Sequence, residues 1–136
     1  MRGGLGLVFG AALMAGPAWA GDRPPVPAVP SGIEVALQEA ILDVKPDGML
    51  TYARYRFVAP GIVGAGAPGF DARAADMQYL CDAYALPQVL NGPDTVDRIS
   101  ISLADRETEF GVADPEATQY FELYRIENGA CIWEEF

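Results

Sequence analysis

Alternating apolar and polar positions predict two strands, each with one face in a hydrophobic core. In residues 49–58, alanine, tyrosine and phenylalanine occupy alternate positions on one side, and Arg54 and Arg56 lie on the other. Residues 99–103 repeat the pattern, with isoleucine or leucine at every second position and serine between them. Because successive side chains of a strand point to opposite faces of a sheet, both segments are predicted to be half-buried strands.

Turn motifs indicate where further strands begin and end. Residues 33–44 fit both the two-residue period of a strand and the spacing of a helix, so this segment stays ambiguous. The Pro-Asp-Gly sequence at 46–48 predicts a reversal into the next strand. Asn128-Gly129 separates two strand-like runs, and Asn-Gly in that position predicts a tight hairpin.

Residues 70–85 are predicted to form the main helix. Apolar side chains recur there three or four positions apart and form one stripe. The glycine-rich residues 59–69 before the helix predict a loop, without the residue order of a phosphate-binding loop. The Leu86-Pro87 step is predicted to end the helix. The members of the stripe are Phe70, Ala74, Met77, Cys81 and Tyr84.

The two cysteines, Cys81 and Cys131, permit a single intramolecular disulfide. Redox catalysis, the alternative, needs cysteines close together in sequence, so we expect a structural bond. Closing a loop of about 50 residues stabilises a fold by roughly 4 kcal/mol in the chain-entropy model. The elements together predict an α+β fold: an antiparallel sheet of four or five strands with one main helix packed on it, tied to the last strand by this disulfide.

The first twenty residues predict a signal peptide. Arg2 precedes an uncharged apolar run, and Ala18 and Ala20 are the small residues that signal peptidase recognises. The run is too short to span a bilayer, which takes about 20 apolar residues. We therefore expect cleavage after Ala20 and export to the periplasm or the medium, with no membrane span in the mature chain.

Residues 21–30 are predicted to form a proline-rich tether, and residues 31–136 a single α+β domain. Four prolines in the tether remove backbone donors and favour an extended polyproline II segment. A ligand for a proline-binding groove is the alternative to a spacer, and a spacer is the expected use.

Composition excludes several kinds of chemistry. The chain has 136 residues, with nine lysines and arginines against 19 aspartates and glutamates, and no histidine. Without histidine there is no Ser-His-Asp triad, no Cys-His pair and no imidazole metal site. A net charge of −10 repels nucleic acid and anionic lipid surfaces.

Carboxylates are the main remaining candidates for chemistry. Asp105, Glu107 and Glu109 would project to one face of an extended chain, with Arg106 on the other. Two carboxylates across a sugar-sized gap are the arrangement of a glycosidase, although a solvated strand end has the same pattern.

Two arginines and two aspartates suggest other uses. Arg54 and Arg56 share a strand face and can clamp a carboxylate or a phosphate, but ion pairs within so acidic a chain are the expected use. Asp43 and Asp47 lie close together without the spacing of a calcium loop. We expect no metal and no cofactor.

Six segments carry a further signal: residues 54–60, 80–81, 84–87, 99–106, 109–111 and 124–134. Together they resemble a family of small exported proteins from alphaproteobacteria of the Rhodobacter group, a domain of unknown function with some members named acetolactate synthase. The resemblance implies no catalytic residues. Acetolactate synthases are several times longer, bind thiamine diphosphate and act in the cytoplasm, so that activity is not expected of a chain with an export signal.

Two hypotheses for function follow. The first is a non-enzymatic periplasmic interaction or accessory protein, whose acidic surface binds a basic envelope protein. The second is a small carboxylate-dependent hydrolase or ligand-binding domain that uses Asp105, Glu107 or Glu109 with Arg106. A concave site lined by aromatic side chains would favour the second, and a flat apolar patch with an acidic rim the first.

Overall fold

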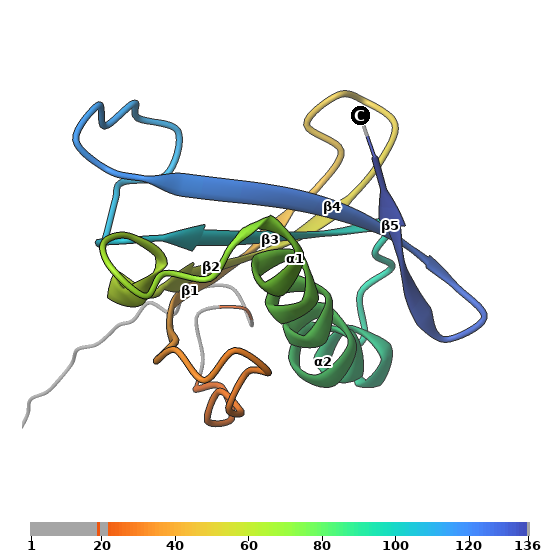
Figure 1. Ribbon diagram of the computed structural model, residues 1–136. Helices are drawn as coiled ribbons and strands as arrows, with labels where there is room; N and C mark the ends of the chain where they lie inside the picture. Colours follow the sequence, from red (N-terminus) through yellow and green to blue (C-terminus); the bar gives the residue numbers. More distant parts are fainter. Residues whose placement is uncertain (1–18, 20–21, 136) are drawn as a thin grey trace, which may run out of the picture.

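Five strands form a single sheet in the computed structural model, which describes residue 19 and residues 22–135 (Figure 1). The strands follow one another across the sheet in chain order. The ambiguous segment before the first turn is a strand. The strands are β1 (Ala36–Asp43), β2 (Tyr52–Val58), β3 (Arg98–Ala104), β4 (Gln119–Glu127) and β5 (Ala130–Glu134).

The sheet is antiparallel except for the central pair, β2 and β3, which are parallel. Parallel neighbours need a crossover, and a helical run provides it. This run comprises α1 (Phe70–Tyr79), the π-helical segment η4 (Leu80–Ala85) and α2 (Leu86–Asn91), after a short 3-10 turn, η3 (Pro60–Ile62). Figure 1 shows the run along one face of the sheet, which confirms the predicted α+β class with one main helix.

The helix does not end at Leu86-Pro87, where the sequence predicts its end. In η4 the turns are wider, and the Leu86 N–H donates to the Cys81 carbonyl five residues earlier. Pro87 is the second residue of α2 and follows these wide turns directly, so its missing N–H falls where the hydrogen-bond spacing changes from five residues to four. The helix therefore continues to Asn91.

The core lies between the helical run and the sheet. The alternation predicted for the two central strands is confirmed, because Ala53, Tyr55 and Phe57 of β2 and Ile99, Ile101 and Leu103 of β3 all belong to the core. The predicted disulfide joins Cys81 of η4 to Cys131 of β5, with the two Cα atoms 6.3 Å apart. The largest fully buried side chains include Tyr55, Phe57, Met77, Leu80, Ile99, Ile101, Leu103 and Tyr124.

The described part of the predicted tether contacts the helical layer. Val29 is 5% exposed and belongs to the core. The Tyr84 hydroxyl donates to the Pro24 carbonyl at 2.7 Å. The fully buried Asp76 accepts from the backbone N–H of Ser31 at 2.9 Å and from its hydroxyl at 2.5 Å. These contacts hold residues before position 31 against the domain.

Two further sequence predictions concern the ends of the chain. The predicted hairpin is confirmed, because Asn128 and Gly129 connect β4 to β5 with φ angles of 53° and 72°. The cleavage residues Ala18 and Ala20 lie outside the described residues. Over the described part of the chain, no helix has the length and apolar character needed to cross a membrane.

Candidate functional site

The sheet face opposite the helical run carries a cavity. In Figure 1 the loops 44–51 and 105–118 rise beyond this face at opposite ends of the sheet. The cavity has a volume of about 370 Å³, within the range of small-molecule sites. The sheet contributes Arg54, Arg56, Ser100, Ser102, Gln119 and Phe121 to its lining, and the loop contributes residues 109–113.

The strand period explains why polar groups line this cavity. On β2 the alternation that buries Tyr55 turns Arg54 and Arg56 to the opposite face. The register places Arg54 beside Ser100 and Arg56 beside Ser102 on β3. The predicted shared face of the two arginines is therefore the floor of the cavity.

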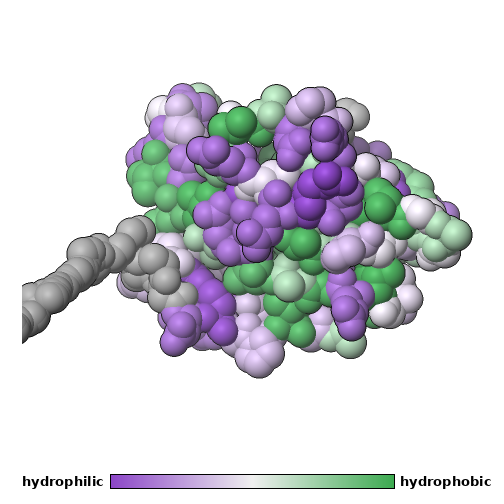
Figure 2. Space-filling view, turned by 90° about the vertical axis from the view of Figure 1, so that its left-hand side faces the viewer, coloured by the Kyte–Doolittle hydropathy of each residue, from purple (hydrophilic) through white to green (hydrophobic). Residues whose placement is uncertain are grey.

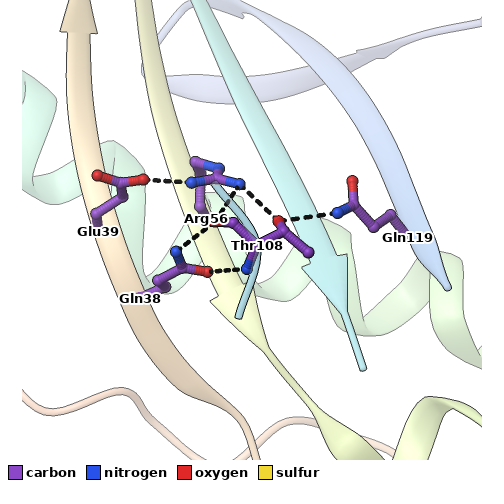
Figure 3. A network of polar contacts seen from close by, with 5 residues as sticks. All are labelled: Gln38, Glu39, Arg56, Thr108 and Gln119. Atoms are coloured by element: carbon purple, nitrogen blue, oxygen red, sulfur yellow. Dashed lines mark hydrogen bonds and ion pairs between the residues drawn. The ribbon is translucent and has the colours of Figure 1, made fainter. Parts of the chain in front are cut away.

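Arg56 holds the loop that forms one wall of the cavity (Figure 3). One terminal nitrogen of its guanidinium pairs with Glu39 on β1. The other donates to the Thr108 carbonyl at 3.1 Å and to the Thr108 hydroxyl at 2.8 Å. Because its side chain is only 11% exposed and both of its terminal nitrogens are engaged, Arg56 acts as a positioning group.

Thr108 is the anchor of the loop 105–118. The Gln38 side-chain amide donates to the Thr108 carbonyl at 2.7 Å and accepts from the Thr108 N–H at 3.3 Å. Gln119 donates to the Thr108 hydroxyl at 2.9 Å. Figure 3 shows these side chains converging from three strands. Sequence reasoning missed Thr108 because Arg56 and Gln38 lie more than 50 positions away along the chain.

Arg54 is the more accessible of the two arginines. Its Nε donates to Asp43 at 2.9 Å, and its side chain is 25% exposed. Its guanidinium carbon lies 4.8 Å from the centre of the Tyr52 ring and 5.7 Å from that of Phe110. Among the described residues its two terminal nitrogens have no hydrogen-bond partner, so they can donate to a ligand.

The mouth of the cavity is apolar and aromatic. Phe110 and Phe121 are 47% and 62% exposed, and Val112 is 54% exposed. Phe110 also faces Arg56, with 5.4 Å from the guanidinium carbon to the ring centre. Exposed aromatic groups beside a concave site suit an apolar part of a ligand.

The predicted carboxylates do not form one group. Residues 105–109 are not a strand, and of the three carboxylates in the described structure only Glu109 lines the cavity. Asp105 instead accepts from the Thr118 N–H at 2.9 Å and pairs with Arg106 at 3.1 Å. The hydrogen bond from Arg106, followed by that from the Thr118 N–H, holds the pKa of Asp105 below its usual value.

The other predicted carboxylates serve the turn between β1 and β2. Asp47 accepts from the backbone N–H groups of Leu50 and Met49 at 2.9 and 2.8 Å, and these hydrogen bonds lower its pKa. Asp43 is the partner of Arg54. Within the described residues, no group of three or more cysteine, aspartate or glutamate side chains is placed to hold a metal ion.

The surface next to the loop 105–118 carries both hydrophilic and hydrophobic side chains. Figure 2 shows a hydrophilic band there, with hydrophobic patches on both sides. The loop 105–118 itself contains five carboxylates and one arginine, together with the exposed Phe110 and Val112. The cavity therefore opens beside a surface that is acidic and partly apolar.

Fold and site together define a small α+β domain with a basic floor and an aromatic mouth on its open sheet face. Residues 10–136 match the family of unknown function DUF6497, and the chain belongs to this family. Neither the curated proteins nor the solved structures contain a match.

Proposed function

We propose that this protein is a non-enzymatic binding protein that holds a small organic carboxylate on the open face of its sheet. The observation that carries the proposal is Arg54, which lines the cavity and whose guanidinium is held by Asp43 at Nε, with no hydrogen-bond partner for its terminal nitrogens among the described residues. A guanidinium held in one orientation can donate two parallel hydrogen bonds to the two oxygens of a carboxylate. The exposed Phe110 and Phe121 favour a ligand that also has an apolar part.

The arrangement of acids supports binding over hydrolysis. A glycosidase-type mechanism needs two carboxylates on either side of the scissile bond. Glu109 is at the cavity, whereas Asp105 is engaged by Arg106 and the Thr118 backbone. The chain also has no histidine to serve as a general base.

The proposed place of action is the periplasm or the medium. The signal-peptide pattern with cleavage after Ala20 supports export. The disulfide between Cys81 and Cys131 is consistent with an oxidising, extracytoplasmic compartment.

The experiment is a titration of the exported, purified protein with 3-phenylpropanoate, a carboxylate with an aromatic ring, followed by NMR. We expect shifts at the Arg54 Nε–H and at the backbone amides of residues 109–113. Arg54→Gln should weaken binding by about tenfold or more, because charge-assisted hydrogen bonds are lost. Arg125→Gln is the matched control, since Arg125 pairs with Glu127 and lies outside the lining. Equal binding by both variants, or no shifts at the cavity, would contradict the proposal.

A second candidate function is the docking of a basic envelope protein on the acidic loop. The loop carries a strong excess of carboxylates, and the Glu116 side chain is 84% exposed. Such a complex should weaken as salt rises, because exposed charges are screened. The test is cross-linking and capture of the tagged protein in a salt series, with Glu107→Gln/Glu116→Gln as the variant. Capture that is indifferent to both salt and the variant would exclude this role.

A further inference from the structure

We propose that the ligand of this cavity is a zwitterion of the amino-acid type with an apolar side chain. Its carboxylate binds Arg54 and its ammonium binds Glu109. The inference rests on the proposed function and adds the second charge of the ligand.

The carboxylate end is set by Arg54. Asp43 binds its Nε at 2.9 Å, and the rings of Tyr52 and Phe110 contact the same guanidinium. These contacts hold the guanidinium in place and leave its terminal N–H groups able to donate to the two oxygens of a carboxylate. Ser100 and Ser102 lie next to the arginines on the cavity floor.

The ammonium end is set by Glu109. Glu109 is one of the residues that line the cavity, and among the described residues its carboxylate has no hydrogen-bond or ion-pair partner. Glu109 directly precedes Phe110, whose ring centre is 5.7 Å from the Arg54 guanidinium carbon. Glu109 and Arg54 therefore line the same cavity.

The charge balance of the site favours a ligand with a positive group. Two arginines, Arg54 and Arg56, meet three carboxylates, those of Asp43, Glu39 and Glu109, so the site carries one net negative charge. Asp43 and Glu39 already have arginine partners, whereas Glu109 does not. A simple anion would be repelled by Glu109, but an ammonium on the same ligand turns that repulsion into an ion pair.

The surroundings strengthen this preference. The whole chain has a net charge of −10, and the loop above the cavity is itself acidic, so a multiply charged anion such as a phosphate is disfavoured. The exposed Phe110, Val112 and Phe121 can cover an apolar side chain. A molecule with both charges and an apolar group satisfies all three features of the cavity.

The experiment compares three related compounds by NMR titration of the exported protein: L-phenylalanine, 3-phenylpropanoate, which lacks the ammonium, and phenethylamine, which lacks the carboxylate. L-phenylalanine should bind about fivefold more tightly than 3-phenylpropanoate, the size expected of one partly exposed ion pair. Phenethylamine should bind more weakly than L-phenylalanine, because it offers the Arg54 guanidinium no carboxylate. The dipeptide L-alanyl-L-phenylalanine, whose ammonium and carboxylate lie further apart, is titrated in the same way. Weaker binding than that of L-phenylalanine would indicate a free amino acid as the ligand, and tighter binding a short peptide.

Glu109→Gln is the decisive variant. It should remove the advantage of L-phenylalanine and leave the affinity for 3-phenylpropanoate unchanged or higher. Glu107→Gln is the control, because this acid is also exposed but lies outside the cavity lining. If 3-phenylpropanoate binds at the cavity as tightly as L-phenylalanine, the zwitterion proposal is wrong and the carboxylate-binding function stands. If no compound shifts the cavity resonances, both proposals are wrong.

Discussion

Thr108 shows how one small side chain can shape a binding site. Its hydroxyl is 2.8 Å from Arg56 and 2.9 Å from the Gln119 amide, and the residue is 7% exposed. Replacing it with valine preserves the shape but leaves both donors without this acceptor. Thr108→Val should lower the free energy of unfolding by about 1–3 kcal/mol, measured by urea denaturation.

The matched control for that variant is Thr118→Val in the same loop. The Thr118 backbone binds Asp105, but its hydroxyl donates and accepts no hydrogen bond among the described residues. Its replacement should therefore change stability by about 0.5 kcal/mol or less. Equal losses for the two variants would show that the Thr108 hydroxyl does not anchor the loop.

Asp76 is a second buried polar residue that the sequence pattern hides. It lies within the predicted helix at a position that looks solvated, yet it is fully buried and binds Ser31 twice. Asp76→Ala should cost about 2–4 kcal/mol of unfolding free energy, because the Ser31 N–H and hydroxyl lose their acceptor. Asp71→Ala, at an exposed position of the same helix, should cost about 1 kcal/mol or less. A similar loss in both variants would refute the role of Asp76 in holding the N-terminal segment.

At the scale of elements, the disulfide connects the helical run to the edge of the sheet. Cys81 and Cys131 are 50 positions apart, and both are buried. The double variant Cys81→Ala/Cys131→Ala should lose about 3–4 kcal/mol, chiefly because its unfolded chain is less constrained. Urea denaturation should show a lower midpoint. The unfolding free energy should also fall more steeply with urea concentration, since the unfolded chain without the disulfide exposes more surface. An unchanged midpoint would mean that the bond contributes little to stability.

The elements that a local pattern determines were predictable from the sequence. The period of two assigned the faces of β2 and β3, and the Asn128-Gly129 turn located the last hairpin. The prediction that the helix ends at Pro87 was wrong, because the cost of a proline to a helix depends on the turn before it. The wide turns of η4 are not visible in the sequence.

The candidate site was predictable only in part. Arg54 and Arg56 share a face because of strand period alone, which the sequence shows. Glu109 lines the cavity with them, whereas Asp105 does not. This difference depends on the path of the loop 105–118, which is fixed by the contacts of Thr108 with distant strands. No period or motif encodes such contacts.

At the scale of the whole molecule, buried tyrosines make stability depend on high pH. Burial raises the pKa of Tyr55 to about 12, and it also raises the pKa values of Tyr84 and Tyr124. In the unfolded chain these hydroxyls ionise near pH 10. The neutral forms are therefore favoured by folding, and their contribution is complete below pH 10 and is lost as the pH rises above it.

Urea denaturation between pH 8 and pH 11 tests this dependence. The unfolding free energy should change little up to about pH 9.5 and then fall, because the unfolded state binds fewer protons than the native state. Tyr55→Phe should be less stable at pH 8 but should lose less stability between pH 10 and pH 11, since one ionising group is gone. Tyr79→Phe, at an exposed position, should retain the slope of the unmodified protein. If Tyr55→Phe and Tyr79→Phe have the same slope, burial of the Tyr55 hydroxyl is not a source of the alkaline instability.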